Sequence, residues 1–187
     1  AIDLHLSKTV ALKQTRIPHS RILRSFEQEA RILSRIQHPA LAQVTDYFSE
    51  ADSQFLVMTF IPGADLGELL EQRDEPFSVE TVLDWAEQLL DVLEYLHSQR
   101  SPIIHRDIKP QNLKLTPEGR LILLDFGLAK GAITSQNAYT TTRSIVGYTL
   151  QFTAPEQLQS KGTDHRSDIY SLAATLYCLM TGTTPAG

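Results

Sequence analysis

The first third of the chain alternates short apolar runs with polar turns, and one segment has helical periodicity. Consecutive apolar residues within positions 9–13 predict a strand, and the runs at 44–48 and 54–61 predict two more strands around a polar turn. Between them, apolar residues recur at every third or fourth position over residues 21–36, which is the spacing of one helix face. We therefore expect a small sheet accompanied by one amphipathic helix.

The rest of the chain has mainly helical spacing. Residues 62–65, Pro-Gly-Ala-Asp, interrupt the pattern and predict a hinge between two parts. Apolar residues at helical spacing over positions 79–96 follow Ser78, a good N-cap residue, and predict a long, largely buried helix. Leucine-rich runs at 113–115 and 121–124 flank a Thr-Pro-Glu-Gly turn and predict a hairpin.

The composition narrows the possible function classes. The 17 Lys and Arg against 22 Asp and Glu give a net charge of −5, so there is no basic surplus for binding nucleic acid or an anionic membrane surface. The single cysteine, Cys178, cannot form an internal disulfide. It lies in the uncharged run 169–180, which is shorter than the roughly 20 residues of a membrane span and predicts a core helix. The N-terminus lacks the basic-then-apolar order of a signal peptide.

Two short motifs carry the candidate chemistry. Residues 105–112 read His-Arg-Asp-Ile-Lys-Pro-Gln-Asn, and residues 125–127 read Asp-Phe-Gly. Together they provide a carboxylate to orient a hydroxyl, a cation for a transferring phosphoryl group and two oxygen ligands for Mg²⁺. Either Asp alone is more often a turn cap, but both motifs in this order predict phosphoryl transfer. The four residues concerned are Asp107, Lys109, Asn112 and Asp125.

These motifs resemble the catalytic loop H-R-D-x-K-x-x-N and the D-F-G turn of the protein kinase family. The segment at residues 10–13, Val-Ala-Leu-Lys, is similar to the family's V-A-I-K strand, and residues 154–156 match its A-P-E motif. The stretch from 107 to 131 resembles bacterial eukaryote-like serine/threonine kinases in particular. This resemblance implies a cytoplasmic kinase domain that belongs to a larger protein. The resemblance covers nearly all of the chain and implies a partial protein kinase catalytic domain over residues 1–187.

The resemblance implies an α+β, two-lobe protein-kinase-like fold that is truncated at both ends. Residues 1–61 are then a partial N-lobe of sheet plus helix, and residues 62–187 are a mostly helical partial C-lobe. No G-x-G-x-x-G motif occurs in the chain, and the final helices of a kinase C-lobe are not present. We therefore expect a fragment that is weakly active or inactive alone, with any membrane attachment through regions outside this chain.

The resemblance also implies ATP and Mg²⁺ as cofactors bound between the lobes, and Ser or Thr hydroxyls of proteins as acceptors. Asp107 then orients the acceptor hydroxyl. Lys109 and Lys13 stabilise phosphate charge, and Lys13 contacts the α- and β-phosphates. Asn112 and Asp125 bind the metal ion.

The partner implied for Lys13 is a glutamate on the predicted helix. Glu29 lies three and four positions from Phe26 and Leu33, which places it on the apolar side of that helix. Glu27 is the alternative, but it lies two residues away and points to a different side. We expect Glu29 to be the partner.

The segment Phe-Leu-Val-Met-Thr-Phe-Ile resembles the strand and hinge that hold adenine in the family. Met58 is the expected gatekeeper, and the backbone of Thr59 and Ile61 is expected to bond the base. Asp65 is expected to reach the ribose. An ordinary buried strand explains any one of these side chains equally well, because backbone recognition leaves little trace in sequence. Lys114 stands where the family commonly has an aliphatic floor residue, and its methylene stem can serve if the ammonium reaches outward.

The segment before A-P-E implies the acceptor preference and the regulation. Thr149 falls where serine/threonine kinases place the threonine that contacts the catalytic Asp and Lys, and with Lys109 it favours Ser/Thr over Tyr substrates. Tyr148 stands where the family usually has Gly. Arg106 implies pairing with a phosphate on the loop that precedes this segment. The candidate autophosphorylation sites on that loop are Thr140, Thr141, Thr142 and Ser144.

Several residues of the motifs are expected to be structural. Asp168 is implied as an anchor for the catalytic-loop backbone. An apolar column linking the lobes is implied at Leu33, Val44, His105 and Phe126. We therefore expect His105 to pack in the core, as many histidines do, and not to act as a general base.

Two other function classes remain open. A small-molecule phosphotransferase of kinase-like fold shares an H-x-D-x-x-x-x-N loop, but should lack the A-P-E segment. A pseudokinase, or an inactive fragment, acts by nucleotide or protein binding and can retain the same polar residues. A Gly-rich loop directly upstream in the full-length protein favours the enzyme over the pseudokinase.

Overall fold

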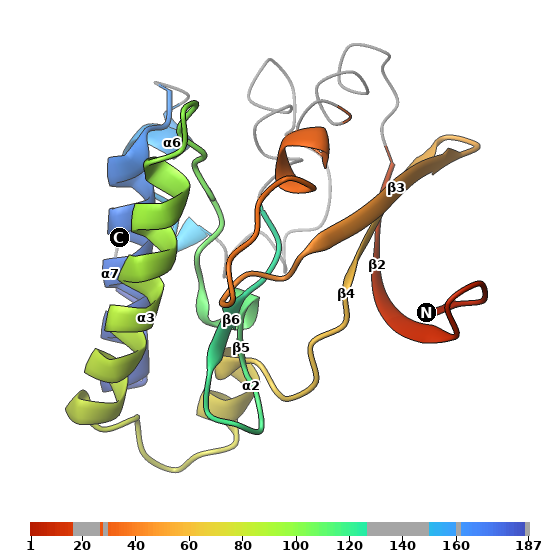
Figure 1. Ribbon diagram of the computed structural model, residues 1–187. Coiled ribbons are helices and arrows are strands. Elements are labelled where there is room, and N and C mark those ends of the chain that lie inside the picture. Colours follow the sequence, from red (N-terminus) through yellow and green to blue (C-terminus); the bar gives the residue numbers. More distant parts are fainter. Residues whose placement is uncertain (17–26, 28–29, 127–149, 160–161, 186–187) are drawn as a thin grey trace.

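The computed structural model describes residues 1–16, 27, 30–126, 150–159 and 162–185. Its first part is a four-stranded antiparallel sheet of strand order β1-β2-β4-β3 (Figure 1). The strands are β1 (Ile2–Asp3), β2 (Lys8–Arg16), β3 (Val44–Glu50) and β4 (Ser53–Thr59). The three predicted strands are confirmed, although β4 ends two residues before Ile61 and β2 extends further than expected.

The register of the sheet brings the predicted nucleotide-binding residues onto neighbouring strands. In the β2–β4 pair, Ala11 lies opposite Met58 and Lys13 lies opposite Leu56. Strand β4 leads directly from these positions into the linker that joins the two parts of the chain. The strand that carries Lys13 is therefore fixed against the strand that enters the linker.

The second part of the chain is mostly helical. Its helices and strands are α2 (Leu66–Glu71), α3 (Val79–His97), the 3₁₀ helix η1 (Pro110–Asn112), β5 (Leu113–Leu115), β6 (Leu121–Leu123), α6 (Pro155–Leu158) and α7 (His165–Thr181). The long helices α3 and α7 lie side by side, and the β5–β6 hairpin lies between them and the sheet (Figure 1). The predicted hairpin and both long helices are confirmed.

The ends of the long helices follow from local chemistry. The Ser78 side chain accepts a hydrogen bond from the Thr81 N–H, as an N-cap residue does. Helix α7 begins after Asp164, whose carboxylate accepts from the Arg166 N–H. It ends at Gly182, which adopts φ 71°, a left-handed conformation that glycine allows at little cost.

Two expectations about the helices were wrong or incomplete. Helix α2 was not predicted, because six residues are too few for a clear period, and its start depends on a capping box between Asp65 and Glu68.

Helix α3 is not buried on most sides: Val79, Leu83 and Leu90 are 59%, 57% and 48% exposed. Helix α3 packs against α7 and β6, and His38 also lies against its Tyr95 ring. Of the helix predicted over residues 21–36, only 27 and 30–36 are described, and 27 and 30–33 are helical.

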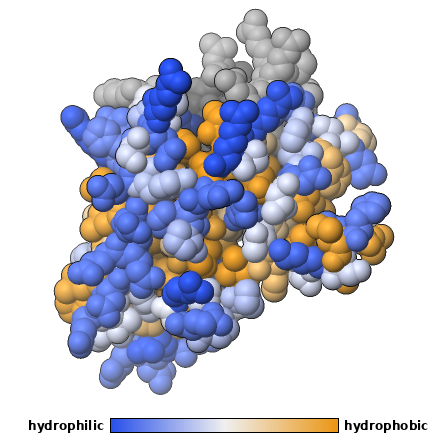
Figure 2. All heavy atoms as spheres, viewed as in Figure 1, coloured by the Kyte–Doolittle hydropathy of each residue, from blue (hydrophilic) through white to orange (hydrophobic). Residues whose placement is uncertain are grey.

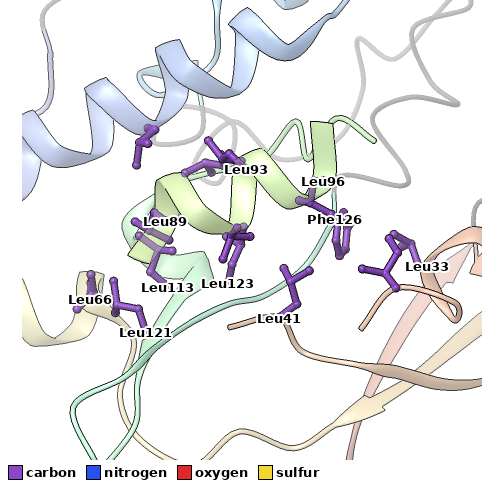
Figure 3. Packing of buried hydrophobic residues seen from close by; sticks show 14 of the residues in the cluster. Leu33, Leu41, Leu66, Leu89, Leu93, Leu96, Leu113, Leu121, Leu123 and Phe126 are labelled. Carbon is purple, nitrogen blue, oxygen red and sulfur yellow. The ribbon is translucent and has the colours of Figure 1, made fainter. Parts of the chain in front are cut away.

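One hydrophobic core runs through both parts (Figure 3). Leu33 and Leu41 from the first part lie near Phe126 and Leu123 of the second, and all four belong to this core. Val44 belongs to it as well. The His105 and Phe126 rings are 4.7 Å apart, which agrees with the predicted column.

Backbone hydrogen bonds hold the segment before β3 against β6. The Leu123 N–H donates to the Ala40 carbonyl over 2.9 Å, and the Ala42 N–H donates to the Leu123 carbonyl over 3.2 Å. Because β6 leads into Asp125 two residues later, these bonds position the candidate metal ligand relative to the sheet.

The surface is mixed, and Figure 2 shows orange apolar residues scattered among blue ones over the face. The most exposed large apolar residues are Ile2, Leu4 and Leu6, at the N-terminal end of the sheet. Cys178 is buried, as its place in the apolar run predicted. Within the described residues, no helix has the length and apolarity that a membrane span requires.

Candidate active site

One buried carboxylate binds the backbone of the catalytic-loop motif. Asp168 in α7 is fully buried, and its two oxygens accept 2.8 Å hydrogen bonds from the N–H groups of His105 and Arg106. Arg106 has φ 67°, an uncommon conformation for a residue with a side chain, and these bonds help to maintain it. The predicted anchoring role of Asp168 is confirmed.

A third contact of this carboxylate was not predicted. His97, the last residue of α3, places Nε2 2.9 Å from Asp168 Oδ2. The two residues are 71 positions apart, and a histidine at a helix end gives no sequence signal of such a bond. The ends of α3, α7 and the catalytic loop are therefore joined at one buried group.

Asp107, Lys109 and Asn112 meet at one place. The Asn112 Nδ2 group donates to the Asp107 carbonyl over 2.7 Å and to Asp107 Oδ2 over 3.0 Å. The Lys109 Nζ atom lies 3.3 Å from the same Oδ2 atom. The structure thus brings together three of the predicted site residues, with the Asn112 amide and the Lys109 ammonium both at the Oδ2 atom of Asp107.

Asp125 lies opposite Lys13, across the interface between the two parts. The Lys13 Nζ atom is 3.1 Å from Asp125 Oδ1, and the two side chains are 29% and 37% exposed. Asp125 has φ 50°, and the N–H of the preceding Leu124 donates to the Asn112 carbonyl over 2.8 Å. The segments that carry Asn112 and Asp125 are therefore directly bonded to each other.

The expected partner of Lys13 was Glu29, which lies outside the described residues. Among the described residues, Lys13 forms an ion pair with Asp125. The pairing with Glu29 stays a prediction. Thr149 and the candidate sites Thr140, Thr141, Thr142 and Ser144 also lie outside the described residues.

The donor set of Asn112 and Asp125 fits a hard cation. Because the Asn112 Nδ2 group donates to the carbonyl and to the Oδ2 atom of Asp107, the amide Oδ1 is the atom with which Asn112 can bind a metal. Asp125 adds a carboxylate oxygen. In the described part of the chain, no group of three or more His, Cys, Asp and Glu residues could form a metal cage by itself. Two oxygen donors without a protein cage suit Mg²⁺, which usually keeps waters and binds substrate phosphates.

The residues predicted to hold adenine lie at the end of β4 and in the linker that follows it. Met58 is buried at the end of β4, and the Thr59 N–H donates to the Gln43 carbonyl over 2.9 Å. Ile61 lies in the linker itself. Asp65 serves as the N-cap of α2, where Oδ1 accepts from the Glu68 N–H over 2.9 Å. The Asp65 carboxylate that is predicted to contact a ribose therefore also caps helix α2.

The ammonium of Lys114 reaches outward to the linker. Its Nζ atom lies 2.7 Å from the Gly63 carbonyl oxygen and 3.3 Å from that of Ile61. This geometry agrees with the expectation that the ammonium group of Lys114 points out of the adenine site.

His105 is a packing residue, as predicted. Burial lowers the pKa of His105 below its ordinary value of 6.5, and this effect outweighs the nearby carboxylates of Asp168, Asp107 and Asp125, which favour the charged form. Its Nε2 atom lies 2.9 Å from the Leu124 carbonyl oxygen, so the neutral ring donates from Nε2. A fully buried ring that faces the core has no access to a substrate.

The A-P-E segment is fastened to the catalytic loop and to α7. The Gln157 side chain donates to the Arg106 carbonyl over 3.3 Å, and the Ser167 hydroxyl donates to Glu156. The Arg106 Nε atom donates to the Thr163 hydroxyl over 3.0 Å. The guanidinium that was expected to pair with a phosphate is thus bound to the loop before α7.

Comparisons with known proteins agree with this geometry. Residues 1–187 match the family model for the protein kinase domain. The chain is 35% identical to a probable serine/threonine-protein kinase of Streptomyces coelicolor, over 99% of the chain and 28% of that protein. It is also 35% identical to serine/threonine-protein kinase PknL of Mycobacterium bovis, over 98% of the chain and 45% of PknL.

The fold is shared with a solved kinase structure. The crystal structure of Rad53 in complex with AMP-PNP matches all of this chain and 45% of the Rad53 chain, with a TM-score of 0.76 and 24% sequence identity. This match confirms the predicted two-lobe kinase-like fold. The chain spans less than half the length of these three proteins. The match of its whole length to the domain, together with the motifs and their geometry, shows that the chain belongs to the protein kinase family.

Proposed function

We propose that the protein containing this chain transfers the γ-phosphoryl group of ATP to Ser or Thr hydroxyls of proteins. The observation that carries the proposal is the grouping of Asp107, Lys109 and Asn112, with Asp125 bonded through its neighbour to Asn112. Relatives of 35% identity that are named serine/threonine-protein kinases support the choice of acceptor.

Each side chain has a distinct task in this reaction. The Asp107 carboxylate accepts a hydrogen bond from the acceptor hydroxyl and orients it toward the phosphorus atom. Lys109 lies close enough to Asp107 to place its charge beside the same transferring group. Asn112 and Asp125 would hold Mg²⁺, which supplies positive charge that offsets the charge of the phosphates. Lys13 would exchange its Asp125 contact for a contact with the α- and β-phosphates.

Regulation is proposed to act through the segment before A-P-E. A phosphate on Thr140, Thr141, Thr142 or Ser144 would compete with the Thr163 hydroxyl for Arg106. A doubly charged phosphate is a stronger acceptor than a hydroxyl, so the guanidinium is expected to turn toward it. We further propose a cytoplasmic signalling role, with membrane attachment only through regions outside this chain.

A second candidate function is nucleotide or protein binding without turnover. The observation that favours it is the Lys13–Asp125 ion pair, because it engages the carboxylate that is expected to bind the metal. A pseudokinase retains this pair in the presence of nucleotide, whereas an active kinase breaks it when Mg-ATP binds.

The decisive experiment is transfer of radiolabelled phosphate from ATP by the full-length protein, followed by phosphoamino-acid analysis. Phosphoserine or phosphothreonine is expected, with loss of label in Asp107→Asn and normal label in Asp84→Asn. Asp84 is a matched control because it is exposed on α3, away from the site. Phosphotyrosine as the main product contradicts the acceptor assignment. Nucleotide binding without any transfer favours the second candidate.

A further inference from the structure

Lys114 makes an unusual connection between the hairpin and the linker. It is the central residue of β5, two positions after Asn112, and its Nζ atom donates to the carbonyls of Gly63 and Ile61. The same atom lies 5.9 Å from the centre of the Phe60 ring, within the range of a weak cation–π interaction. One ammonium group therefore contacts three of the six linker residues between β4 and α2.

The backbone supports this connection at the same place. The Leu115 N–H donates to the Ala64 carbonyl over 3.2 Å. Gly63 adopts φ 108°, and a Cβ atom built there would lie 2.2 Å from the Leu115 carbonyl oxygen. The linker and β5 thus approach each other so closely at residue 63 that only glycine fits. The Lys114 side chain binds the linker carbonyls immediately before and after Pro62.

These contacts restrict a segment that would otherwise have few attachments. A glycine with positive φ can adopt many conformations when nothing holds it, and ordering it costs conformational entropy. Hydrogen bonds from a charged donor are stronger than those between neutral groups, and the bond to Ile61 is partly buried. The ammonium also donates a hydrogen bond to the Ile61 carbonyl. The linker groups that we propose to bond the adenine base are therefore the Ile61 N–H and the Thr59 carbonyl.

We infer that Lys114 is a positioning residue that fastens the linker to β5 and so sets the affinity for the nucleotide. It acts through Ile61 and Gly63, and does not touch the transferring phosphate. The part of the inference that concerns affinity rests on the proposed function, because the ligand is ATP. The part that concerns the linker rests on the contacts alone.

The test uses three variants of the full-length protein. Lys114→Met removes the charge and keeps the stem, Lys114→Arg retains charge and donors, and Lys8→Met is the matched control because Lys8 is exposed at the start of β2. Hydrogen exchange of the linker amides is measured without nucleotide, and kcat and KM for ATP are measured with a peptide substrate.

In Lys114→Met, linker exchange is expected to become faster and KM for ATP to rise on the order of five- to tenfold, with kcat within about twofold of the wild type. Lys114→Arg should restore most of both values, and Lys8→Met should change neither. A purely structural role would lower the overall stability and the amount of active protein without this split between KM and kcat.

Two outcomes overturn the inference. Unchanged linker exchange in Lys114→Met shows that the linker is held by other contacts. An unchanged or lower KM in that variant shows that fastening the linker does not aid nucleotide binding. If the wild type neither binds ATP nor transfers phosphate, the proposed function fails and the affinity part fails with it, while the exchange measurement still decides whether Lys114 fastens the linker.

Discussion

Replacing Asp168 by alanine is expected to destabilise the domain severely. Its carboxylate is fully buried and accepts hydrogen bonds from two backbone N–H groups, those of His105 and Arg106, and lies 2.9 Å from the His97 ring. Alanine leaves both amides without this acceptor, the His105 amide in a buried position and the Arg106 amide in a partly buried one.

The size of the effect follows from the number of groups left unpaired. Each buried donor without a partner costs about 1–3 kcal/mol, so two amides amount to roughly 2–6 kcal/mol. Domains have a total stability of about 5–15 kcal/mol, so this loss is a large part of it. Asp168→Asn keeps one acceptor oxygen and turns an NH₂ group toward the other donor, so an intermediate loss is expected.

The measurement is hydrogen exchange by mass spectrometry, as a function of urea, on peptides from α7 and the catalytic loop. This reports the stability of the kinase domain within the full-length protein, where other domains would complicate a global unfolding curve. Asp84→Asn serves as the control. The reasoning is refuted if Asp168→Ala loses less than about 1 kcal/mol relative to that control, because the two amides must then find other acceptors.

Three further predictions concern the metal site, the core and the linker. Asp125→Asn should weaken Mg-ATP binding, whereas Asp107→Asn should spare it and lower kcat; equal losses of affinity by calorimetry contradict this division. Because burial lowers the pKa of His105, the unfolded chain takes up a proton below pH 6.5 that the folded one does not. The free energy of unfolding is therefore unaffected by His105 above pH 6.5 and decreases as the pH falls below it. His105→Phe should remove this contribution and flatten the dependence of the unfolding free energy on acid pH. An unchanged slope would show that the dependence does not come from His105. Gly63→Ala should lower the unfolding free energy by on the order of 1–3 kcal/mol or displace the linker, because its Cβ would meet a backbone oxygen of β5. Gly119→Ala is the control: Gly119 also has positive φ but faces open space, so its loss should be smaller. Equal losses would show that the contact with β5 adds nothing.

The sequence by itself predicted the candidate chemistry and determined much of the local structure. The order of the two catalytic motifs predicted phosphoryl transfer because few other arrangements place two carboxylates, an amide and a lysine in this way. The start of α3 at Ser78 and the β5–β6 hairpin were also predictable. Caps and turns depend on interactions within about four residues, which a sequence displays directly.

The tertiary structure decided which distant groups became partners. The pairing of Lys13 with Asp125, the bond from His97 to Asp168 and the reach of Lys114 to the linker each join residues at least 51 positions apart. No local pattern encodes such pairs, because they depend on how the sheet, the hairpin and the helices pack around one core. The exposed face of α3 was unpredictable for the same reason: periodicity shows that a face is apolar, and only packing shows whether another element covers it.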